Sequence, residues 1–316
     1  MKVQSLARSL AALLASALFV FSVALAGVFL PSCGSLAQAA GIAAGAAGAA
    51  GLIDSDVAGA ITTSTDAIGR ALEEITPEQE YYIGRAVGAT ILARYRIYTG
   101  SPARTLYVNK ILQAVVVNSP KPELYNGYHA LILDSPEINA FATSGGHVFV
   151  TLGLVNTAAS EDALAAVLAH EVAHIQLQHS LKAIRTSRIT TAVMATGSAA
   201  VNLAASGTSL AELTDIFDES ITDIVGTMVN NGYSRDQEFE ADALALSLLS
   251  RAGYDPSSLI EMLRALETGL GNSDGGFGRT HPAPRDRISS ANRQLASVPR
   301  PSDTRAARGG RFAESR

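Results

Sequence analysis

The chain has 316 residues, is 47% hydrophobic and carries a formal net charge of −5 at pH 7. That length allows one or two domains, and the apolar content is ample for a sizeable core. The acidic balance gives no electrostatic basis for binding nucleic acid, and a single cysteine excludes an internal disulfide.

Residues 1–33 are predicted to be an export signal. A short basic start ending at Arg8 is followed by an apolar run from Leu10 to Leu30 that contains no charge. The only cysteine, Cys33, follows shortly after this run and resembles the lipidated cysteine of a bacterial lipobox. We therefore expect an exported lipoprotein, attached to the membrane on the periplasmic side of the cell envelope. The alternatives are an uncleaved membrane anchor, since about 21 apolar residues can span a bilayer, and a soluble secreted protein.

The rest of the chain divides by composition into three parts. Residues 34–75 are rich in alanine and glycine and predict a flexible tether. Residues 76–297 have the patterns of one domain, in which a small-residue stretch at 189–205 favours a packed or interfacial helix over a membrane span. Residues 298–316 contain two prolines and five arginines, and they predict a disordered, mildly basic tail.

Within the domain, proline and glycine positions and apolar periodicity predict a sequence of helices around one hairpin. The predicted elements are helices over 77–94 and 103–117, a strand over 128–133, a strand–turn–strand hairpin over 138–151, a helix that starts after Ser160, and helices over 189–205, 210–229, 236–251 and 256–267.

The helix after Ser160 contains the pattern His170-Glu-Val-Ala-His174. Ser160 is a helix-capping residue, and residues four apart on a helix lie one above the other. Both imidazoles therefore project from one face and can hold one metal ion, for which zinc is the natural candidate. Glu171 lies about 100° round the helix, where it can reach a water at the metal without being a ligand. The alternative is a buried helix that contains two histidines by chance.

Zinc in a peptidase needs a third protein ligand and an open position for water. A metzincin extension would place glycine and histidine where this chain has Leu177 and Ser180, so it is excluded. Glu238 and Asp242 are four apart and share one face of a later helix, whereas Glu240 points elsewhere. One carboxylate can ligate the metal while the other accepts the outer N–H of a ligand histidine. A charged helix end has the same spacing, and spacing alone leaves both interpretations open.

Three ordered motifs together resemble the gluzincin metallopeptidases of the HtpX and CAAX prenyl protease type. They are Asn139-Ala-Phe-Ala-Thr-Ser-Gly-Gly-His-Val-Phe-Val-Thr151, His170-Glu-Val-Ala-His174 and Ser234-Arg-Asp-Gln-Glu-Phe-Glu-Ala-Asp242, and the resemblance extends to Thr280-His281-Pro282 and Arg287. It implies a mainly helical α+β, zincin-like domain with a small antiparallel sheet or hairpin beside the active-site helix. It also implies one zinc ion per chain, held by His170, His174 and Glu238, with Asp242 supporting a ligand.

The resemblance and the chemistry of the motifs predict a zinc metalloendopeptidase. Glu171 is the expected general base. His281 is expected to stabilise the oxyanion, and Arg287 is a second candidate for that role or for structural support. An extended substrate pairs with an exposed edge strand, and the edge expected here is formed by His147, Val148, Phe149 and Val150.

The chain is most similar to the exported bacterial branch of that family, which works on envelope proteins. The expected substrates are therefore unfolded or misassembled polypeptides of the bacterial cell envelope. The alternatives are an envelope chaperone or assembly factor with a latent zinc site, and a zinc hydrolase that is not a peptidase.

Overall fold

The computed structural model describes residues 75–182, 232–270, 277–281, 284–302 and 305–315, together with four single positions. The chain divides into two compact units, and every element below belongs to the unit formed by Ile75–Ile184 and Phe217–Arg316. Apart from those single positions and residue 75, the predicted export signal with Cys33, the tether, and the helices predicted at 189–205 and 210–229 lie outside the described residues. Among the helices that the structure describes, none combines the length and the apolar character needed to cross a bilayer.

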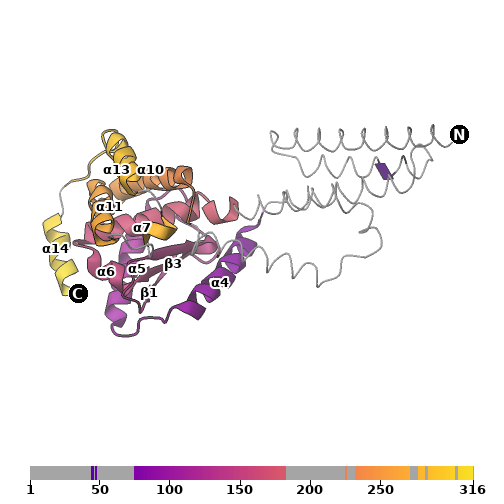
Figure 1. Ribbon diagram of the computed structural model, residues 1–316, viewed down its shortest axis with the longest axis horizontal. Coiled ribbons are helices and arrows are strands. Elements are labelled where there is room, and N and C mark those ends of the chain that lie inside the picture. The colour runs from indigo at the N-terminus through magenta and orange to yellow at the C-terminus, as the bar shows by residue number, and fades with distance from the viewer. Residues whose placement is uncertain are drawn as a thin grey trace. The chain divides into compact units, whose positions relative to one another are not determined.

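A sheet of three short strands lies at one side of the domain (Figure 1). The strands are β1 (His129–Leu133), β2 (Ala140–Thr143) and β3 (His147–Thr151), in the order β1-β3-β2. The predicted hairpin is confirmed, since β2 and β3 pair antiparallel. β1 joins β3 in parallel, so the sheet as a whole is mixed.

A short 3-10 turn, η1 (Ser144–Gly146), connects the two hairpin strands. Gly145 and Gly146 adopt φ of 75° and 97°, which side chains disfavour and glycine accepts. Helix α4 (Pro77–Arg94) packs directly on this turn, because a Cβ on its Gly84 would lie 1.7 Å from the carbonyl oxygen of Ser144. Glycines in α4 and in η1 thus allow the backbones of these two segments to contact each other directly.

The prediction that β3 is an exposed edge is wrong. β3 is the middle strand, paired with β1 along one side and β2 along the other. The outer side of β1 is closed by Asn109, which bonds the N–H and C=O of Ala130 at 2.9 and 2.8 Å, and by Gln113, which donates to the carbonyl of Tyr128 at 2.7 Å. Among the described strands, β1 and β2 each have a strand partner on one side alone, and these side-chain bonds cover the outer side of β1.

The two faces of the sheet contact different helices, because side chains alternate along each strand. Phe141 and Phe149 belong to the cluster formed with α4, whereas Ala142 and Val148 belong to the larger core. That core contains α5 (Pro102–Val117) and α7 (Glu161–Gln176), with α6 (Leu152–Thr157) leading from β3 into it. The sheet is therefore covered on both faces, and α7 lies on the face opposite α4.

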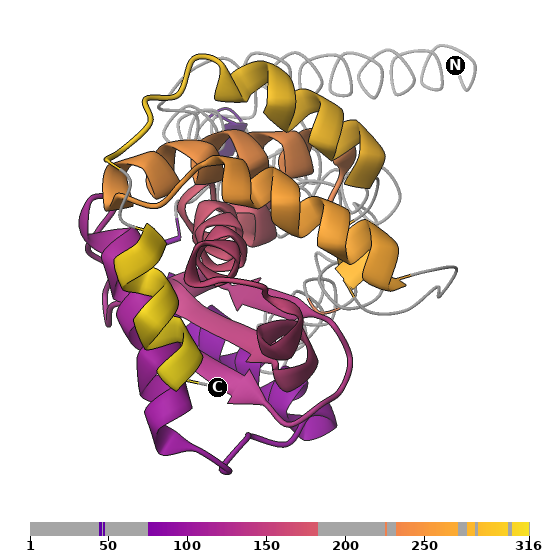
Figure 2. The same ribbon diagram turned by 90° about the vertical axis from the view of Figure 1, so that its left-hand side faces the viewer.

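Helices on the other side of α7 leave it in the middle of the domain (Figure 2): two pack on α7 directly, and a third packs on those two. They are α10 (Arg235–Ala252), α11 (Ser257–Leu270) and α13 (Pro284–Leu295), and the single turn α12 (Phe277–Thr280) precedes α13. Every residue of α7 is buried as a result. The expected α+β class is confirmed: a mainly helical domain with a small sheet beside the helix of the two histidines.

The structure corrects the prediction of a disordered tail over 298–316. Residues Arg305–Glu314 form helix α14, which packs on α7 with Phe312 buried. Arg308 donates two hydrogen bonds of 2.8 Å to Asp162 in the first turn of α7. Two of the arginines that gave this segment the composition of a solvated tail, Arg308 and Arg311, are instead partners of the buried carboxylates of Asp162 and Glu161.

Candidate metal centre

The two motif histidines lie one above the other on α7, as predicted. Ser160 caps the helix by accepting the N–H of Ala163 at 3.1 Å, which fixes where the first turn begins. Ten residues later, His170 and His174 point to the same side, with 3.0 Å between their Nε2 atoms. Both imidazoles are buried.

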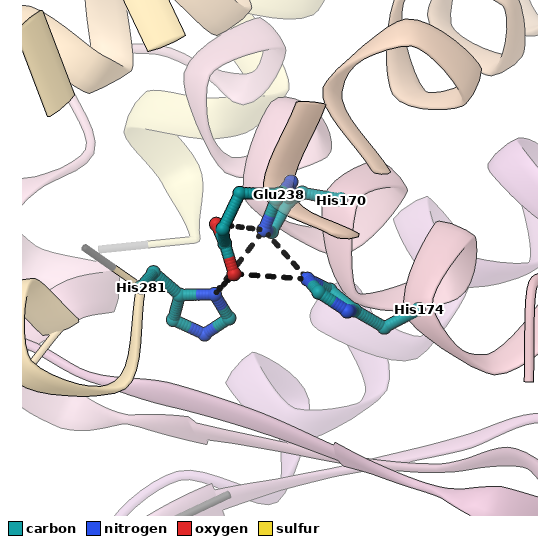
Figure 3. Close-up of side chains that lie close together, drawn as sticks. All are labelled: His170, His174, Glu238 and His281. Atoms are coloured by element: carbon teal, nitrogen blue, oxygen red, sulfur yellow. Dashed lines mark hydrogen bonds and ion pairs between the residues drawn. The ribbon is translucent and has the colours of Figure 1, made fainter. Parts of the chain in front are cut away.

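Two further side chains converge on these nitrogens from other elements (Figure 3). Glu238, in the first turn of α10, places its carboxylate oxygens 3.4 Å from Nε2 of His170 and 3.5 Å from Nε2 of His174. His281 follows α12, and its Nδ1 lies 3.0 Å from Glu238 Oε1 and 3.3 Å from His170 Nε2. One ligand atom from each of the four residues fits within 4.8 Å, and all four residues are buried.

The donor set fits a zinc ion. Imidazole nitrogens and a carboxylate are the ligands that zinc takes in gluzincin-type sites. Glu171 supplies a second observation: both of its carboxylate oxygens are buried without a hydrogen-bond partner in the described part of the chain. A buried carboxylate left without partners is costly, and functional sites are where such groups persist. The centre is therefore arranged to receive a cation with its water.

Arg287 and Asp242 bond to His170 and Glu238 on the side away from the metal group. Asp242 Oδ1 lies 3.0 Å from the outer nitrogen, Nδ1, of His170. Arg287, on α13 and fully buried, donates to both oxygens of Asp242 at 2.9 and 2.8 Å and forms a 2.8 Å ion pair with Glu238. Of the two roles considered for Arg287, this geometry favours structural support, because its guanidinium faces carboxylates rather than open space.

The charged groups shift one another's pKa values strongly. Burial acts to raise the pKa of Glu238, but Arg287 and His281 outweigh it and hold the pKa well below its usual range. Burial and Arg287 act to lower the pKa of His170, yet hydrogen bonds to Asp242 and Glu238 raise it to about 9. The same carboxylates favour any positive charge at this point. They would stabilise a metal cation as well as a proton.

Glu171 differs from the other carboxylates of the centre. Burial raises its pKa above the ordinary carboxyl value, and the neighbouring His281, with 3.5 Å between His281 Nε2 and Glu171 Oε1, acts in the opposite direction. A carboxylate with a raised pKa binds a proton more tightly than an ordinary carboxylate, which suits a general base.

Sequence reasoning missed two residues of the centre. The ring of Tyr233 stacks on His174 with 4.0 Å between centroids, and its buried hydroxyl has no hydrogen-bond partner among the described residues. His179 is also buried, with its Nδ1 2.9 Å from Nδ1 of His174. Tyr233 directly precedes Ser234, which caps α10, so its place beside the Glu238 motif was the available signal. His179 lies one position before the place of a metzincin histidine, so no motif pointed to it.

The residues of β3 do not join the metal group. His147, at the start of the strand, bonds Thr143 through Nδ1 at 3.2 Å and stacks on Tyr81 at 5.3 Å between centroids. Val148, Phe149 and Val150 are buried in the middle of the sheet. The residues predicted to bind substrate therefore lie in the middle strand of the sheet, away from the metal group.

Comparison with known sequences assigns the domain to a family. Residues 102–295 match Peptidase family M48, a stretch longer than half of the 316-residue chain. The chain belongs to peptidase family M48. The matched residues run from α5 to α13 and include all four residues of the metal group, whereas α4 and α14 lie outside the match. The prediction of zinc as cofactor is confirmed by this membership together with the buried group of ligands.

Three proteins illustrate the range of M48 relatives. The mitochondrial metalloendopeptidase OMA1 of Schizosaccharomyces pombe is 34% identical over 191 residues, which cover 58% of this chain and 51% of that protein. The beta-barrel assembly-enhancing protease of Escherichia coli is 29% identical over 230 residues, covering 70% of this chain and 44% of that protein. The metalloprotease YcaL of Escherichia coli is 30% identical over 161 residues, covering 51% and 59%. The chain thus spans about half the length of the relatives it matches.

Proposed function

We propose that the protein is a zinc-dependent endopeptidase. The observation that carries this proposal is Glu171, a fully buried carboxylate without a hydrogen-bond partner, placed one residue after ligand His170 and within 3.5 Å of His281. A zinc site that serves folding alone has no need of such a group. Membership of a peptidase family and relatives named as proteases support the same reaction.

The side chains divide the reaction between them. His170, His174 and Glu238 would hold the zinc ion, which when bound would polarise the scissile carbonyl and lower the pKa of a water molecule. Glu171 takes a proton from the attacking water and passes it to the leaving amine. Asp242 and Arg287 hold His170 and Glu238 in place through buried hydrogen bonds and an ion pair.

We also propose that a polypeptide substrate lies extended along β2 rather than β3. β2 has one strand partner among the described strands, and it packs beside α7. Pairing with a strand edge reads the backbone more than the side chains, so it suits unfolded or misassembled polypeptides. Ala142→Pro, which removes one backbone donor in β2, should weaken substrate binding while zinc content stays normal.

A latent site is the second candidate, and His281 favours it. Its Nδ1 reaches the same ligand group, and four protein ligands would fill a tetrahedral zinc ion and leave no position for water. The two roles of His281 predict opposite results for His281→Ala. Hydrolysis should rise if the imidazole blocks the zinc and should fall if it stabilises the oxyanion. Increased hydrolysis would support an assembly factor whose protease is held inactive.

Attachment to the cell envelope is part of the proposal and rests on the sequence of the first 33 residues. A lipid on Cys33 would hold the domain at the membrane, because each buried CH₂ contributes about 0.8 kcal/mol. Cys33→Ser should stall processing or release the protein from the membrane fraction. Palmitate labelling provides the check: an unlabelled wild type with an intact N-terminus would show an uncleaved anchor instead.

The decisive experiment measures zinc content and casein degradation of the purified full chain beside Glu171→Gln. The wild type should bind one zinc ion per chain and degrade casein, and the variant should bind the same zinc without degrading casein. Equal turnover by both proteins would overturn the peptidase mechanism.

A further inference from the structure

The outer nitrogens of the two ligand histidines have different partners. In His170 the outer nitrogen, Nδ1, faces the buried carboxylate of Asp242 at 3.0 Å. In His174 it faces another imidazole, that of His179, at 2.9 Å. His179 in turn has its Nε2 3.2 Å from the carboxylate of Glu240, which lies at the surface of α10 with 54% of its side chain exposed.

A backbone turn at the end of α7 puts His179 in this place. The helix ends at Gln176, and Gln178 adopts φ of 55°. It is the one non-glycine residue with positive φ in the part of the chain that the structure describes. That conformation is strained for a residue with a side chain, and strain of this kind concentrates at functional sites. The turn brings His179 back beside His174, fully buried, instead of letting it continue along the helix.

We propose that Glu240 and His179 form a hydrogen-bond relay that positions His174 for the metal. This inference rests on the proposed zinc site. A metal bound through Nε2 of His174 leaves the hydrogen of that ring on Nδ1, where it is donated to Nδ1 of His179. The hydrogen of His179 then lies on Nε2 and is donated to Glu240. Each donor meets one acceptor, so a single tautomer of each ring satisfies the whole chain of bonds.

The relay does for His174 what Asp242 does for His170. A ligand histidine needs an acceptor on its outer nitrogen, which orients the ring and raises its basicity. At His170 the acceptor is buried and paired with Arg287. At His174 the acceptor is the imidazole of His179, and the carboxylate behind it, Glu240, lies at the surface. Lys182 lies 3.5 Å from that carboxylate. Glu240, which the sequence placed away from the metal, thus acts on it through two rings.

The test compares zinc affinity in variants of the full chain, by competition with a chelator. His179→Leu removes the acceptor and should weaken zinc binding by about 10–100-fold. His179→Asn keeps an amide oxygen near the place of Nδ1 and should recover part of that loss. Glu240→Ala leaves the buried rings in place and should weaken binding less, by about 10-fold. Glu261→Ala, an exposed glutamate on α11, is the matched control and should bind zinc like the wild type.

Two further measurements separate positioning from packing. The melting temperature of the protein after zinc removal should be unchanged in Glu240→Ala, and its kcat should fall with little change in KM. Zinc affinity of Glu240→Ala and His179→Leu equal to that of the wild type would overturn the relay and leave the peptidase proposal intact. The relay would also be overturned if His179→Asn lost as much affinity as His179→Leu and both melted early. A wild type that binds no zinc would overturn the relay and the proposed function together.

Discussion

The two ends of helix α7 carry buried carboxylates in opposite states. At its N-terminal end, Glu161 accepts hydrogen bonds from Tyr107 at 2.5 Å and Tyr254 at 3.0 Å and is paired with Arg311. Toward the other end of α7, Glu171 is as buried as Glu161, and neither of its oxygens has a hydrogen-bond partner in the described residues. Burial is the same at both ends, and the partners differ.

The pKa values follow the partners rather than the burial. Burial acts to raise the pKa of Glu161, but the bonds from Arg311, Tyr107 and Tyr254 outweigh it and the pKa lies below its usual value. Burial raises the pKa of Glu171 although the charges of His281, His170 and Arg287 act to lower it, because none of them donates a hydrogen bond to its oxygens. A carboxylate with every lone pair occupied stabilises the fold, whereas one that is left open is available for chemistry. The contrast separates the structural end of α7 from the reactive end.

The largest effect should come from the reactive end. Glu171→Gln keeps the shape of the side chain but cannot accept a proton, so kcat should fall by about 10²–10⁴-fold. Zinc content should stay normal. After zinc is removed with a chelator, the melting temperature should not fall, because the amide carries no charge to bury. A lower melting temperature would mean that Glu171 has stabilising partners after all, and the contrast between the two ends would fail.

The structural end should respond in stability instead. Arg308→Ala leaves Asp162 buried without its two 2.8 Å bonds, and breaking a buried ion pair costs about 3–5 kcal/mol. Urea unfolding of the full chain measures the loss. Arg293→Ala, an exposed arginine on α13, is the control and should change stability by about 0.5 kcal/mol or less. Equal effects of the two variants would show that α14 does not hold α7.

Acid should weaken the structural end through Glu161. Its folded pKa lies below the ordinary value of 4.5, so its contribution is present above pH 4.5 and is lost as the pH falls through the folded value. Stability measured by urea unfolding should therefore decline below pH 4.5, and Glu161→Gln should reduce that decline. A decline of the same size in the variant would assign the acid sensitivity to other carboxylates.

The features that the sequence predicted are those with local causes. The helix expected over 77–94 is found as Pro77–Arg94, because Thr76 caps it and proline starts it. The stacking of His170 over His174 follows from helical periodicity alone. The pairing of Glu238 with this motif needed the family resemblance, since α10 meets α7 through tertiary contacts.

Two of the three failures involve partners outside the local segment, and the third involves an unusual backbone turn. Strand order placed β3 in the middle of the sheet, which no pattern within residues 138–151 indicates. The prolines and arginines of residues 298–316 predict a solvated tail, whereas the partners of Arg308 and Arg311, Asp162 and Glu161, lie about 150 residues earlier. The role of His179 depends on the turn at Gln178, a residue that seldom adopts positive φ.

The smallest effect should come from two buried tyrosine hydroxyls. That of Tyr254 lies at the structural end of α7, and that of Tyr233 lies at the reactive end. Tyr254→Phe removes a 3.0 Å hydrogen bond to the charged Glu161 and should cost about 1.5 kcal/mol. Tyr233→Phe removes a hydroxyl that has no hydrogen-bond partner in the described residues, so it should cost nothing and can stabilise the fold by sparing the burial of a polar group. Both rings keep their packing, and urea unfolding of the zinc-depleted proteins gives the comparison. If Tyr233→Phe proved the more destabilising of the two, its hydroxyl would have a partner in the folded protein. The reactive end would then contain a bonded tyrosine hydroxyl beside His174, and the contrast with the structural end would be weaker.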